Sequence, residues 1–252
     1  MQPPKINLHI HSSYSDGKNS IEEIVKKALE LDFKYIAITD HFSNTWKAKI
    51  IPTLNSVEKI NSYVVEIRQI QEELICSKEK LLVLVGIEID LESSLNSILS
   101  RINPNDFDLI LFEHFNSHES IPFVSNLLDN WQKRYSKNNL KPLMGLAHCD
   151  PSYFLFDNYE SLISFLRKRD LFFELNSSYS QYYSLKNLPF FKRLKHEEIM
   201  ISISSDAHRL SNLSKIDNAF EMVEFYSLTS NLRRLMLKLK ETRDFLFRQE
   251  FS

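Results

Sequence analysis

The sequence contains very little glycine: its 252 residues include only three, Gly17, Gly86 and Gly145. Glycine is the usual residue where φ is positive, so asparagine and serine are expected to form many of the turns. No glycine-rich loop that could cradle a phosphate is present. All three glycines lie within a few residues of a candidate ligand described below. We therefore expect the backbone to be crowded at those ligands.

Cysteine, positive charge and long apolar runs are also scarce. Cys76 and Cys149 are the two cysteines and lie far apart, which argues against a disulfide framework and favours a reducing compartment. Lys and Arg number 31 against 33 Asp and Glu, so no basic surface for nucleic acid is indicated. No apolar run reaches membrane-spanning length, and the first residues form no apolar signal region. We predict a cytoplasmic protein without a membrane or nucleic-acid partner, and the sequence leaves its oligomeric state open.

Strand-like apolar runs alternate with helical patterns along nearly the whole chain, whose length and 43% hydrophobic content suit one large domain. Ser20 and Glu23 have the spacing of a capping box at the start of the first helix. Helices are expected at about residues 21–29, 57–74, 95–102, 121–135, 159–169, 189–196, 215–226 and 229–247. Seven runs are typical of buried strands: 6–9, 35–39, 81–85, 108–112, 143–147, 171–175 and 200–203. The alternation predicts a parallel sheet covered by helices, either open or closed into a barrel.

Histidine is concentrated at the ends of these runs. Right-handed crossovers place the carboxyl ends of parallel strands on one face, where the active sites of barrels lie. His9 and His11 point to the same side of their strand, and Asp16 follows in a turn that can bring it back over them. Six of the eight histidines occupy these strand ends, although chance placement would scatter them: His9, His11, His41, His114, His148 and His208.

With three carboxylates, these imidazoles form a set of candidate metal ligands on one face: His9, His11, Asp16, His41, Glu88, His114, His148, Asp206 and His208. Nine such groups are too many for one ion and suit two or three, and without a thiolate they favour Zn, Mn or Fe over Mg or Ca. Clustered ions lower the pKa of a shared water and clamp phosphoryl oxygens. We therefore predict hydrolysis of a small phosphorylated substrate by a metal-bridging hydroxide. Asp40, Asp90 and Asp150 are interpreted as partners of metal-bound histidines or as helix caps.

The order and spacing of these residues resemble the PHP (polymerase and histidinol phosphatase) superfamily. The motifs, between about residues 6 and 220, are His9-Ile10-His11, Asp16-Gly17, Thr39-Asp40-His41, Gly86-Ile87-Glu88, His114, Ala147-His148 and Ser205-Asp206-Ala207-His208. The resemblance implies an α/β fold, a distorted barrel of seven βα units similar to a TIM barrel. It implies a single domain over residues 1–252, with the barrel core at about 6–220 and covering helices at about 215–247.

The resemblance also implies a trinuclear centre with all nine ligand positions filled. Its three ligand sets would be His9, His11, Glu88 and Asp206; Glu88, His114 and His148; and Asp16, His41 and His208. Glu88, Asp206 and His208 are the expected catalytic residues. Asp16 and the runs 112–115 and 173–177 are similar to the histidinol-phosphatase branch, which would place the protein in histidine biosynthesis.

The chain departs from that branch where substrate phosphate would be held. Basic residues expected near the fifth-strand histidine and after the sixth-strand asparagine are replaced by residues 149–152 and 177–180. The basic candidates that remain are Lys47, Lys49 and Arg209, of which Lys47 and Arg209 are the expected substrate-binding residues. Tyr179, Tyr182 and Tyr183 either line the mouth of the site or pack in a loop.

The predicted function is hydrolysis of a small phosphomonoester, with histidinol phosphate as the first candidate. The alternatives are a nucleotide phosphodiesterase or 3′–5′ exonuclease, which would need a basic, aromatic-lined groove, and an inactive interaction module. A degenerate barrel of the last kind would have lost ligands, and none is lost in this sequence.

Overall fold

Apolar strands form the centre of the molecule, which we describe from a computed structural model covering residues 3–135, 140–179 and 184–250. The strands are β1 (Ile6–Ile10), β2 (Tyr35–Ile38), β3 (His41–Phe42), β4 (Leu82–Asp90), β5 (Leu109–Glu113), β6 (Leu143–Leu146), β7 (Phe172–Asn176) and β8 (Ile201–Ser204). All pairings are parallel, in the order β1-β2-β4-β5-β6-β7-β8, and β3 pairs with β4 beyond the end of β2. The seven strands on this path are those that the apolar runs predict.

The two edges of the sheet meet at the residues of the N-terminal and C-terminal motifs. Ile10 and Ala207 form a parallel bridge. The amide of His11 donates to the carbonyl of Ala207 at 2.9 Å, and the amide of Ala207 donates to the carbonyl of His9 at 3.2 Å. These bonds nearly close the sheet into a barrel. Of the two predicted arrangements, the closed one is therefore confirmed.

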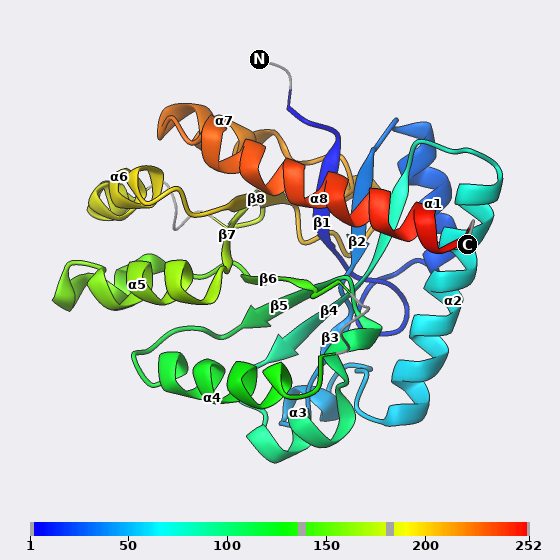
Figure 1. The fold of residues 1–252 in the computed structure, drawn as a ribbon, viewed down its shortest axis with the longest axis horizontal. Helices are drawn as coiled ribbons and strands as arrows, with labels where there is room; N and C mark the ends of the chain where they lie inside the picture. The colour runs from blue at the N-terminus through cyan, green and yellow to red at the C-terminus, as the bar shows by residue number, and fades with distance from the viewer. Residues whose placement is uncertain (1–2, 136–139, 180–183, 251–252) are drawn as a thin grey trace.

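Helices surround the strands (Figure 1). They are α1 (Ile21–Glu30), α2 (Val57–Cys76), α3 (Leu95–Arg101), α4 (Ser120–Gln132), α5 (Glu160–Arg169), α6 (Leu188–His196), α7 (Asp217–Phe225) and α8 (Thr229–Glu250). Helix α1 begins at the predicted capping box, in which the Ser20 side chain accepts from the Glu23 amide and the Glu23 carboxylate accepts from the Ser20 amide. The predicted helices all form, with ends that differ from the prediction by up to three residues.

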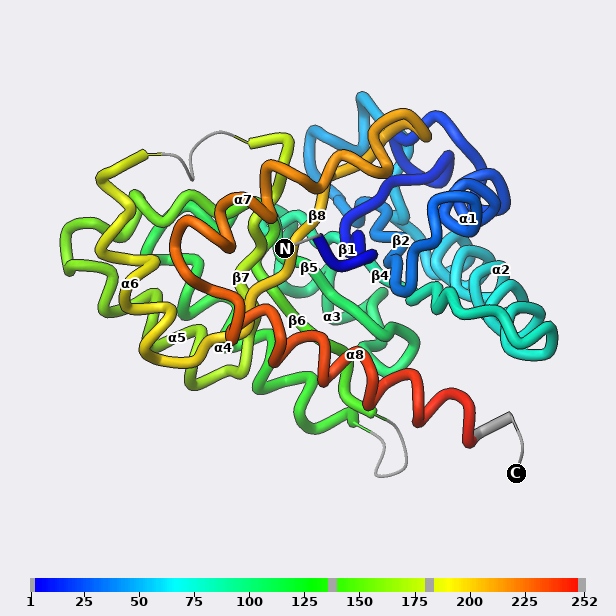
Figure 2. The backbone as a smooth tube through the Cα atoms, turned by 90° about the horizontal axis from the view of Figure 1, so that it is seen from above, coloured from blue at the N-terminus to red at the C-terminus, as the bar shows by residue number. Residues whose placement is uncertain are grey.

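Helix α8 packs on the barrel: it passes in front of β1 and β2 in Figure 1, and Figure 2 shows it along one side of the strands. Its residues Leu232, Leu235 and Leu239 are buried within the chain itself. Arg243 donates to the carbonyl of Lys80, just before β4, which fixes the far part of the helix near the amino ends of the strands. The apolar stripe of this helix is therefore used inside the molecule.

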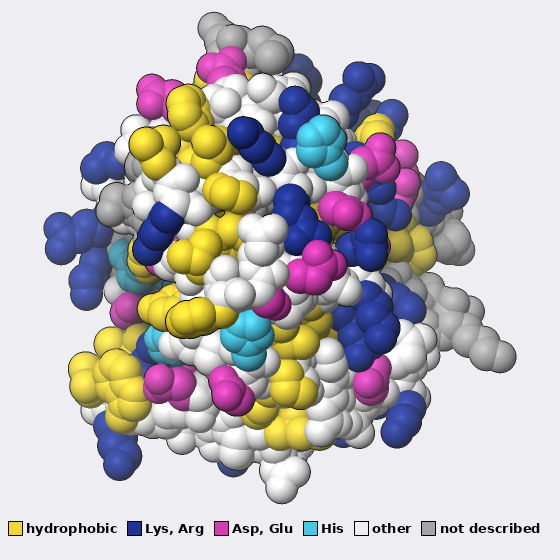
Figure 3. Space-filling view, turned by 90° about the vertical axis from the view of Figure 1, so that its left-hand side faces the viewer, with side chains coloured by type: hydrophobic (Ala, Val, Ile, Leu, Met, Phe, Trp, Pro, Cys, Tyr) yellow, Lys and Arg dark blue, Asp and Glu magenta, His cyan; other side chains and the backbone are white. Residues whose placement is uncertain are grey.

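Charged side chains of both signs are mixed over the face shown in Figure 3, where Lys and Arg lie between acidic and hydrophobic side chains. This mixture agrees with the near-zero net charge of the sequence. Within the described part of the chain, every helix is too short or too polar to cross a membrane.

Candidate metal centre

All nine predicted ligands lie at the carboxyl end of the barrel. Pairing in the sheet sets their positions: His41 on β3 is opposite Glu88 on β4, and Asp90 on β4 is opposite Glu113 on β5. Side chains alternate along β4, so Glu88 and Asp90 point to the same side. Within the described residues, the ligand atoms form five overlapping groups: His11, Asp16, His41 and His208; His9, His11 and Asp206; His9, Glu88 and His148; His41, Glu88 and Glu113; and Asp90, Glu113 and His114.

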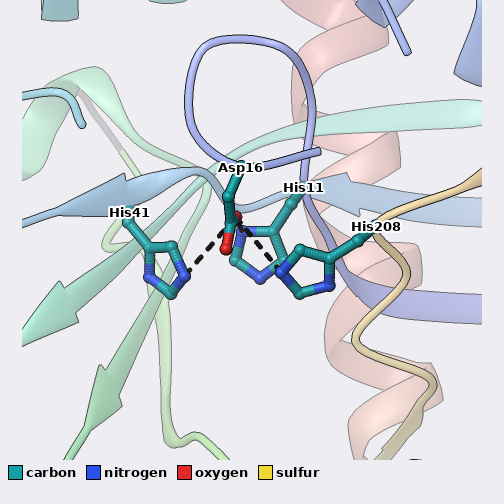
Figure 4. Close-up of side chains that lie close together, drawn as sticks. All are labelled: His11, Asp16, His41 and His208. Carbon is teal, nitrogen blue, oxygen red and sulfur yellow. Dashed lines mark ion pairs between the residues drawn. The ribbon is translucent and has the colours of Figure 1, made fainter. Parts of the chain in front are cut away.

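Asp16 faces three imidazoles from a loop that the sequence folds back over β1 (Figure 4). Its Oδ1 lies 3.1 Å from His208 Nε2, 3.7 Å from His41 Nε2 and 3.8 Å from His11 Nδ1. Gly17 allows this return, because a Cβ there would lie 2.1 Å from the carbonyl oxygen of His11. The expected crowding of the backbone near a ligand is confirmed at this glycine, and its φ is not positive.

Glu88 is fully buried and touches imidazoles with both oxygens. Its Oε1 lies 3.1 Å from His148 Nε2 and 3.3 Å from His9 Nε2. Its Oε2 lies 2.8 Å from His41 Nδ1 and 3.5 Å from His11 Nε2. A carboxylate with imidazole nitrogens beside each of its two oxygens has the arrangement of a ligand that bridges two metal ions.

Carboxylates stand behind three of the imidazoles. Glu174 Oε1 and Asp90 Oδ1 are hydrogen-bonded to the Nδ1 atoms of His9 and His114, each at 2.9 Å, and Glu113 Oε1 lies 3.1 Å from His41 Nδ1. The two hydrogen-bonded carboxylates, Glu174 and Asp90, fix the tautomer and orientation of His9 and His114 and leave the Nε2 atoms of these rings for an ion.

Of these three partners, only Asp90 is predicted from the sequence. Glu174 and Glu113 were missed, although the sequence carries a signal for both. Each is an acid inside or at the end of a short, otherwise apolar strand, and a buried charge requires a partner. Of the other two predicted partners, Asp150 caps the short helix Pro151–Asp157, and Asp40 accepts from Ser12 and Ser15 in the loop that carries Asp16.

Three of the candidate ligands have a backbone conformation that side-chain-bearing residues seldom adopt. The φ angles are 60° at His114, 33° at His148 and 49° at Asp206. Left-handed φ angles at residues other than glycine cluster at functional sites, because the surrounding structure must compensate their cost. Each of these residues follows directly after a strand or within two residues of one, so the strain turns the ligand over the end of the barrel.

Imidazoles and carboxylates in the centre shift each other's pKa values toward the charged forms. Burial alone would lower the pKa of His41, but Glu88 and Glu113 raise it to about 10. Burial likewise opposes charge on His9, yet Glu88 and Glu174 raise its pKa well above the usual range. Burial would raise the pKa of Asp206, and the imidazoles of His9 and His11 instead hold it far below its usual value.

Several nitrogen and oxygen atoms that could bind a metal ion are buried at the centre without a hydrogen bond. His41 Nδ1 and Glu88 Oε2 lie 2.8 Å apart, and Asp206 Oδ1 lies 2.9 Å from His11 Nε2, but none of these buried atoms has the geometry of a hydrogen bond. The Nε2 atoms of His9 and His11 face each other at 3.0 Å. Converging nitrogen and oxygen donors of this kind suit divalent ions of the Zn, Mn or Fe class. The residues therefore fit a metal centre.

The grouping of ligands differs from the predicted one at His114. The prediction joined it to Glu88 and His148, whereas the described structure groups it with Asp90 and Glu113. The reason is its left-handed backbone and the bond from its Nδ1 to Asp90. His114 and His148 nevertheless line one cavity of about 250 Å³.

The two predicted substrate-binding cations differ in their surroundings. Lys47 is nearly buried, and its Nζ donates to both Glu113 oxygens at 2.6 Å. Arg209 is exposed and directly follows His208. Tyr179 lies against the centre, and burial, with Asp206 adding to it, raises the pKa of its hydroxyl far above the usual value. Tyr182 and Tyr183 lie outside the described residues.

Comparison with known proteins agrees with this geometry. A curated relative from Thermotoga maritima, a probable histidinol-phosphatase, is 22% identical over 222 residues, covering 83% of this chain and 87% of its own. The DNA polymerase/3′-5′ exonuclease PolX of Bacillus subtilis is 32% identical over 87 residues, 34% of this chain; the chain spans only 14% of that polymerase.

Two solved structures have the same fold, each with a TM-score of 0.55. Histidinol phosphate phosphatase from Lactococcus lactis, complexed with Zn, L-histidinol and phosphate, is 16% identical, and the match covers 88% of this chain and 93% of that one. A putative histidinol phosphatase from Listeria monocytogenes is 17% identical, with 83% and 97% covered. The family model for the PHP domain matches residues 7–183. The predicted resemblance is thus confirmed, and the chain belongs to the PHP domain family.

Proposed function

We propose that this protein is a metal-dependent phosphatase that hydrolyses a small phosphomonoester, with histidinol phosphate as the first candidate. The observation that carries the proposal is the convergence of nine imidazoles and carboxylates, with Glu88 between four of the imidazoles, at the carboxyl end of the barrel. Similarity over most of the chain to histidinol phosphatases supports a monoester as substrate.

The nine predicted ligands would hold two or three divalent ions. Bound there, such ions supply an activated water and neutralise the charge that develops on phosphoryl oxygens. The protein orients the atoms that would bind these ions. Glu174 and Asp90 fix the rings of His9 and His114, and Glu88 has imidazole nitrogens beside both of its oxygens.

Residues at the mouth of the site would meet the substrate. His208 is partly exposed, and its Nδ1 donates to the backbone carbonyl of Asp206 at 2.9 Å, which directs Nε2 toward Asp16. We propose that His208, with Glu88 and Asp206, forms the catalytic group. Lys47 gives two of its three N–H donors to Glu113, and the third would bind a phosphate oxygen. Arg209, exposed beside His208, would contact the same phosphate.

A nucleotide phosphodiesterase or 3′–5′ exonuclease is the second candidate. The local similarity to a polymerase with exonuclease activity favours it. Strand binding requires a basic groove, whereas the chain has a net charge of −2 and the face in Figure 3 mixes both signs of charge. The two activities differ in the bond that is broken, so a substrate panel separates them.

The test is hydrolysis by the full chain, stripped of metal and reloaded with Mn²⁺ or Zn²⁺. The panel contains histidinol phosphate, a generic phosphomonoester, a nucleotide 3′,5′-bisphosphate and a phosphate bis-ester. His9→Ala removes a ligand, and His196→Ala, at an exposed position on α6, is the matched control. We expect monoester hydrolysis in the wild type and in His196→Ala, and a loss of at least ~100-fold in His9→Ala, the upper end of what loss of an outer-sphere contact costs.

Each other result has a definite meaning. Hydrolysis of the bis-ester alone would replace the phosphatase with a phosphodiesterase. Absence of turnover in protein with metal bound would refute the proposed function and leave the fold as it is. Lys47→Met and Arg209→Met should raise KM for the monoester without changing the metal content, and an unchanged KM in both would remove them from the substrate site.

A further inference from the structure

Tyr179 touches two candidate ligands that come from different strands. It follows β7 by three residues, between the ends of β6 and β8 in the sheet order. Its hydroxyl donates to Asp206 Oδ2 at 3.1 Å. Its ring stacks on the His148 ring, with centroids 4.5 Å apart and planes at 25°. One side chain thus contacts the ligand two residues after β6 and the ligand two residues after β8.

Both of these ligands need support. His148 and Asp206 have left-handed φ angles of 33° and 49°, a conformation that persists only where neighbouring groups compensate its cost. The backbone of His148 is held by Glu174, whose Oε2 accepts its amide at 2.6 Å. The ring of His148 and the carboxylate of Asp206 are the parts that Tyr179 contacts.

Because of the Tyr179 hydroxyl, the two oxygens of Asp206 have different partners. Oδ2 accepts from Tyr179, whereas Oδ1 lies 2.9 Å from His11 Nε2 and 3.5 Å from His9 Nε2. A carboxylate with one oxygen already bonded presents the other as a single ligand atom. Without that bond, the group could rotate and offer both oxygens to one ion.

Tyr179 is itself held firmly by its own turn. Its amide donates to the carbonyl of Asn176 at 3.3 Å, and the Ser178 hydroxyl donates to the carbonyl of Ser205 at 2.7 Å. The latter bond ties the turn after β7 directly to the residue before Asp206. The tyrosine therefore has a fixed base from which to orient both ligands.

We propose that Tyr179 is a positioning residue for the metal centre, which restricts Asp206 to binding through Oδ1 and fixes the plane of the His148 ring. The proposal rests on the metal centre of the proposed function, although it does not depend on which ester is hydrolysed. A tyrosine in the loop after β7 would thus set the orientation of two metal ligands, Asp206 and His148.

The test compares Tyr179→Phe, which removes only the hydroxyl, with Tyr179→Leu, which also removes the stacked ring. Tyr35→Phe is the control, because Tyr35 is a buried tyrosine at the opposite end of its strand from the metal centre. Metal affinity is measured by competition with a chromophoric chelator, and geometry by the visible absorption spectrum of the Co²⁺-loaded protein. Unfolding of the metal-free proteins controls for a loss of folding.

We expect Tyr179→Phe to weaken binding of one ion by about tenfold and to change the Co²⁺ spectrum, and Tyr179→Leu to weaken it by up to ~100-fold, the range for residues that orient ligands. Wild-type affinity and an unchanged Co²⁺ spectrum in Tyr179→Phe would overturn the proposal, and this isosteric variant decides the matter if the leucine variant does not fold. Weakened binding in a protein that hydrolyses no ester would support the positioning role while refuting the phosphatase.

Discussion

Replacing Glu174 by Gln should destabilise the metal-free protein by ~4 kcal/mol, because every partner of this carboxylate is a donor. Its oxygens accept from His9 Nδ1 at 2.9 Å, from the His148 amide at 2.6 Å and from the Ser204 hydroxyl. A hydrogen bond to a charged group contributes about 1 kcal/mol more than a neutral one, so the two bonds that the Gln side chain still accepts lose ~2 kcal/mol. The amide NH₂ must also face one of the donors, which leaves that buried donor unpaired at a cost of ~1–3 kcal/mol.

The assay is thermal unfolding of the metal-free protein together with a metal titration. For a chain of this size, ~4 kcal/mol corresponds to a fall in Tm of about 8–16 °C. The affinity for the ion at His9 should fall by ~10–100-fold, because that ring loses the partner that orients it. Glu197→Gln is the control: Glu197 forms an exposed pair with Arg167 at 2.6 Å, for which a change of at most ~1 kcal/mol is expected. If Glu174→Gln behaved like Glu197→Gln in both assays, the reasoning about the buried carboxylate would be refuted.

Three further predictions concern the same end of the barrel. Because carboxylates raise the pKa of His9 and bring that of His41 to about 10, these imidazoles favour the protonated form in the metal-free protein, and a metal ligand must be neutral. Metal binding should therefore release protons and tighten as pH rises from 6 to 8; calorimetry in buffers of different ionisation enthalpy that detects no release would contradict this. Gly17→Ala places a Cβ 2.1 Å from a backbone oxygen, so it should cost ~1–3 kcal/mol of unfolding free energy and displace Asp16, measured as a lower Tm and one fewer bound ion; unchanged values in both would show that the loop adapts. Asp90→Asn should weaken metal binding by ~10–100-fold in a chelator competition through the loss of its bond to His114, and wild-type affinity would exclude an orienting role.

The sequence predicted the barrel well because most of its strands are buried on both faces and therefore have an unbroken apolar signal. Strand β4 shows where this signal ends. The prediction stopped at residue 85, whereas the strand continues to Asp90. Beyond Gly86 the pattern alternates between apolar residues and the acids Glu88 and Asp90, which are buried in the barrel although acids are rarely buried without partners. The two-residue strand β3 is too short to have a pattern at all.

Membership of the candidate site could be predicted from strand ends, whereas its internal arrangement could not. The rule that strand ends share a face brings His9, Glu88 and His208 together without any knowledge of side-chain direction. The direction of a ligand depends on backbone torsion, and the left-handed φ of His114 turns it toward Asp90. Among the described residues, Asn and Ser fill only two of the ten positive-φ positions outside glycine, so the composition of the turns does not predict such conformations.

Closure of the barrel and assembly of the candidate metal centre depend on the same residues. At the seam, the His11 amide donates to the carbonyl of Ala207 and the Ala207 amide donates to the carbonyl of His9, and Ala207 stands between Asp206 and His208. The four side chains beside these bonds are candidate ligands from opposite ends of the chain, and His11 Nε2 lies 2.9 Å from Asp206 Oδ1 across the seam. An ion held by both segments would bind the closed barrel and not the open one, and would therefore stabilise it by mass action. In the described residues, Asn7 on β1 also exchanges hydrogen bonds with Ser205 just after β8, at 2.7 and 3.3 Å, and an ion bound beside these contacts would add a further link between the first strand and the last.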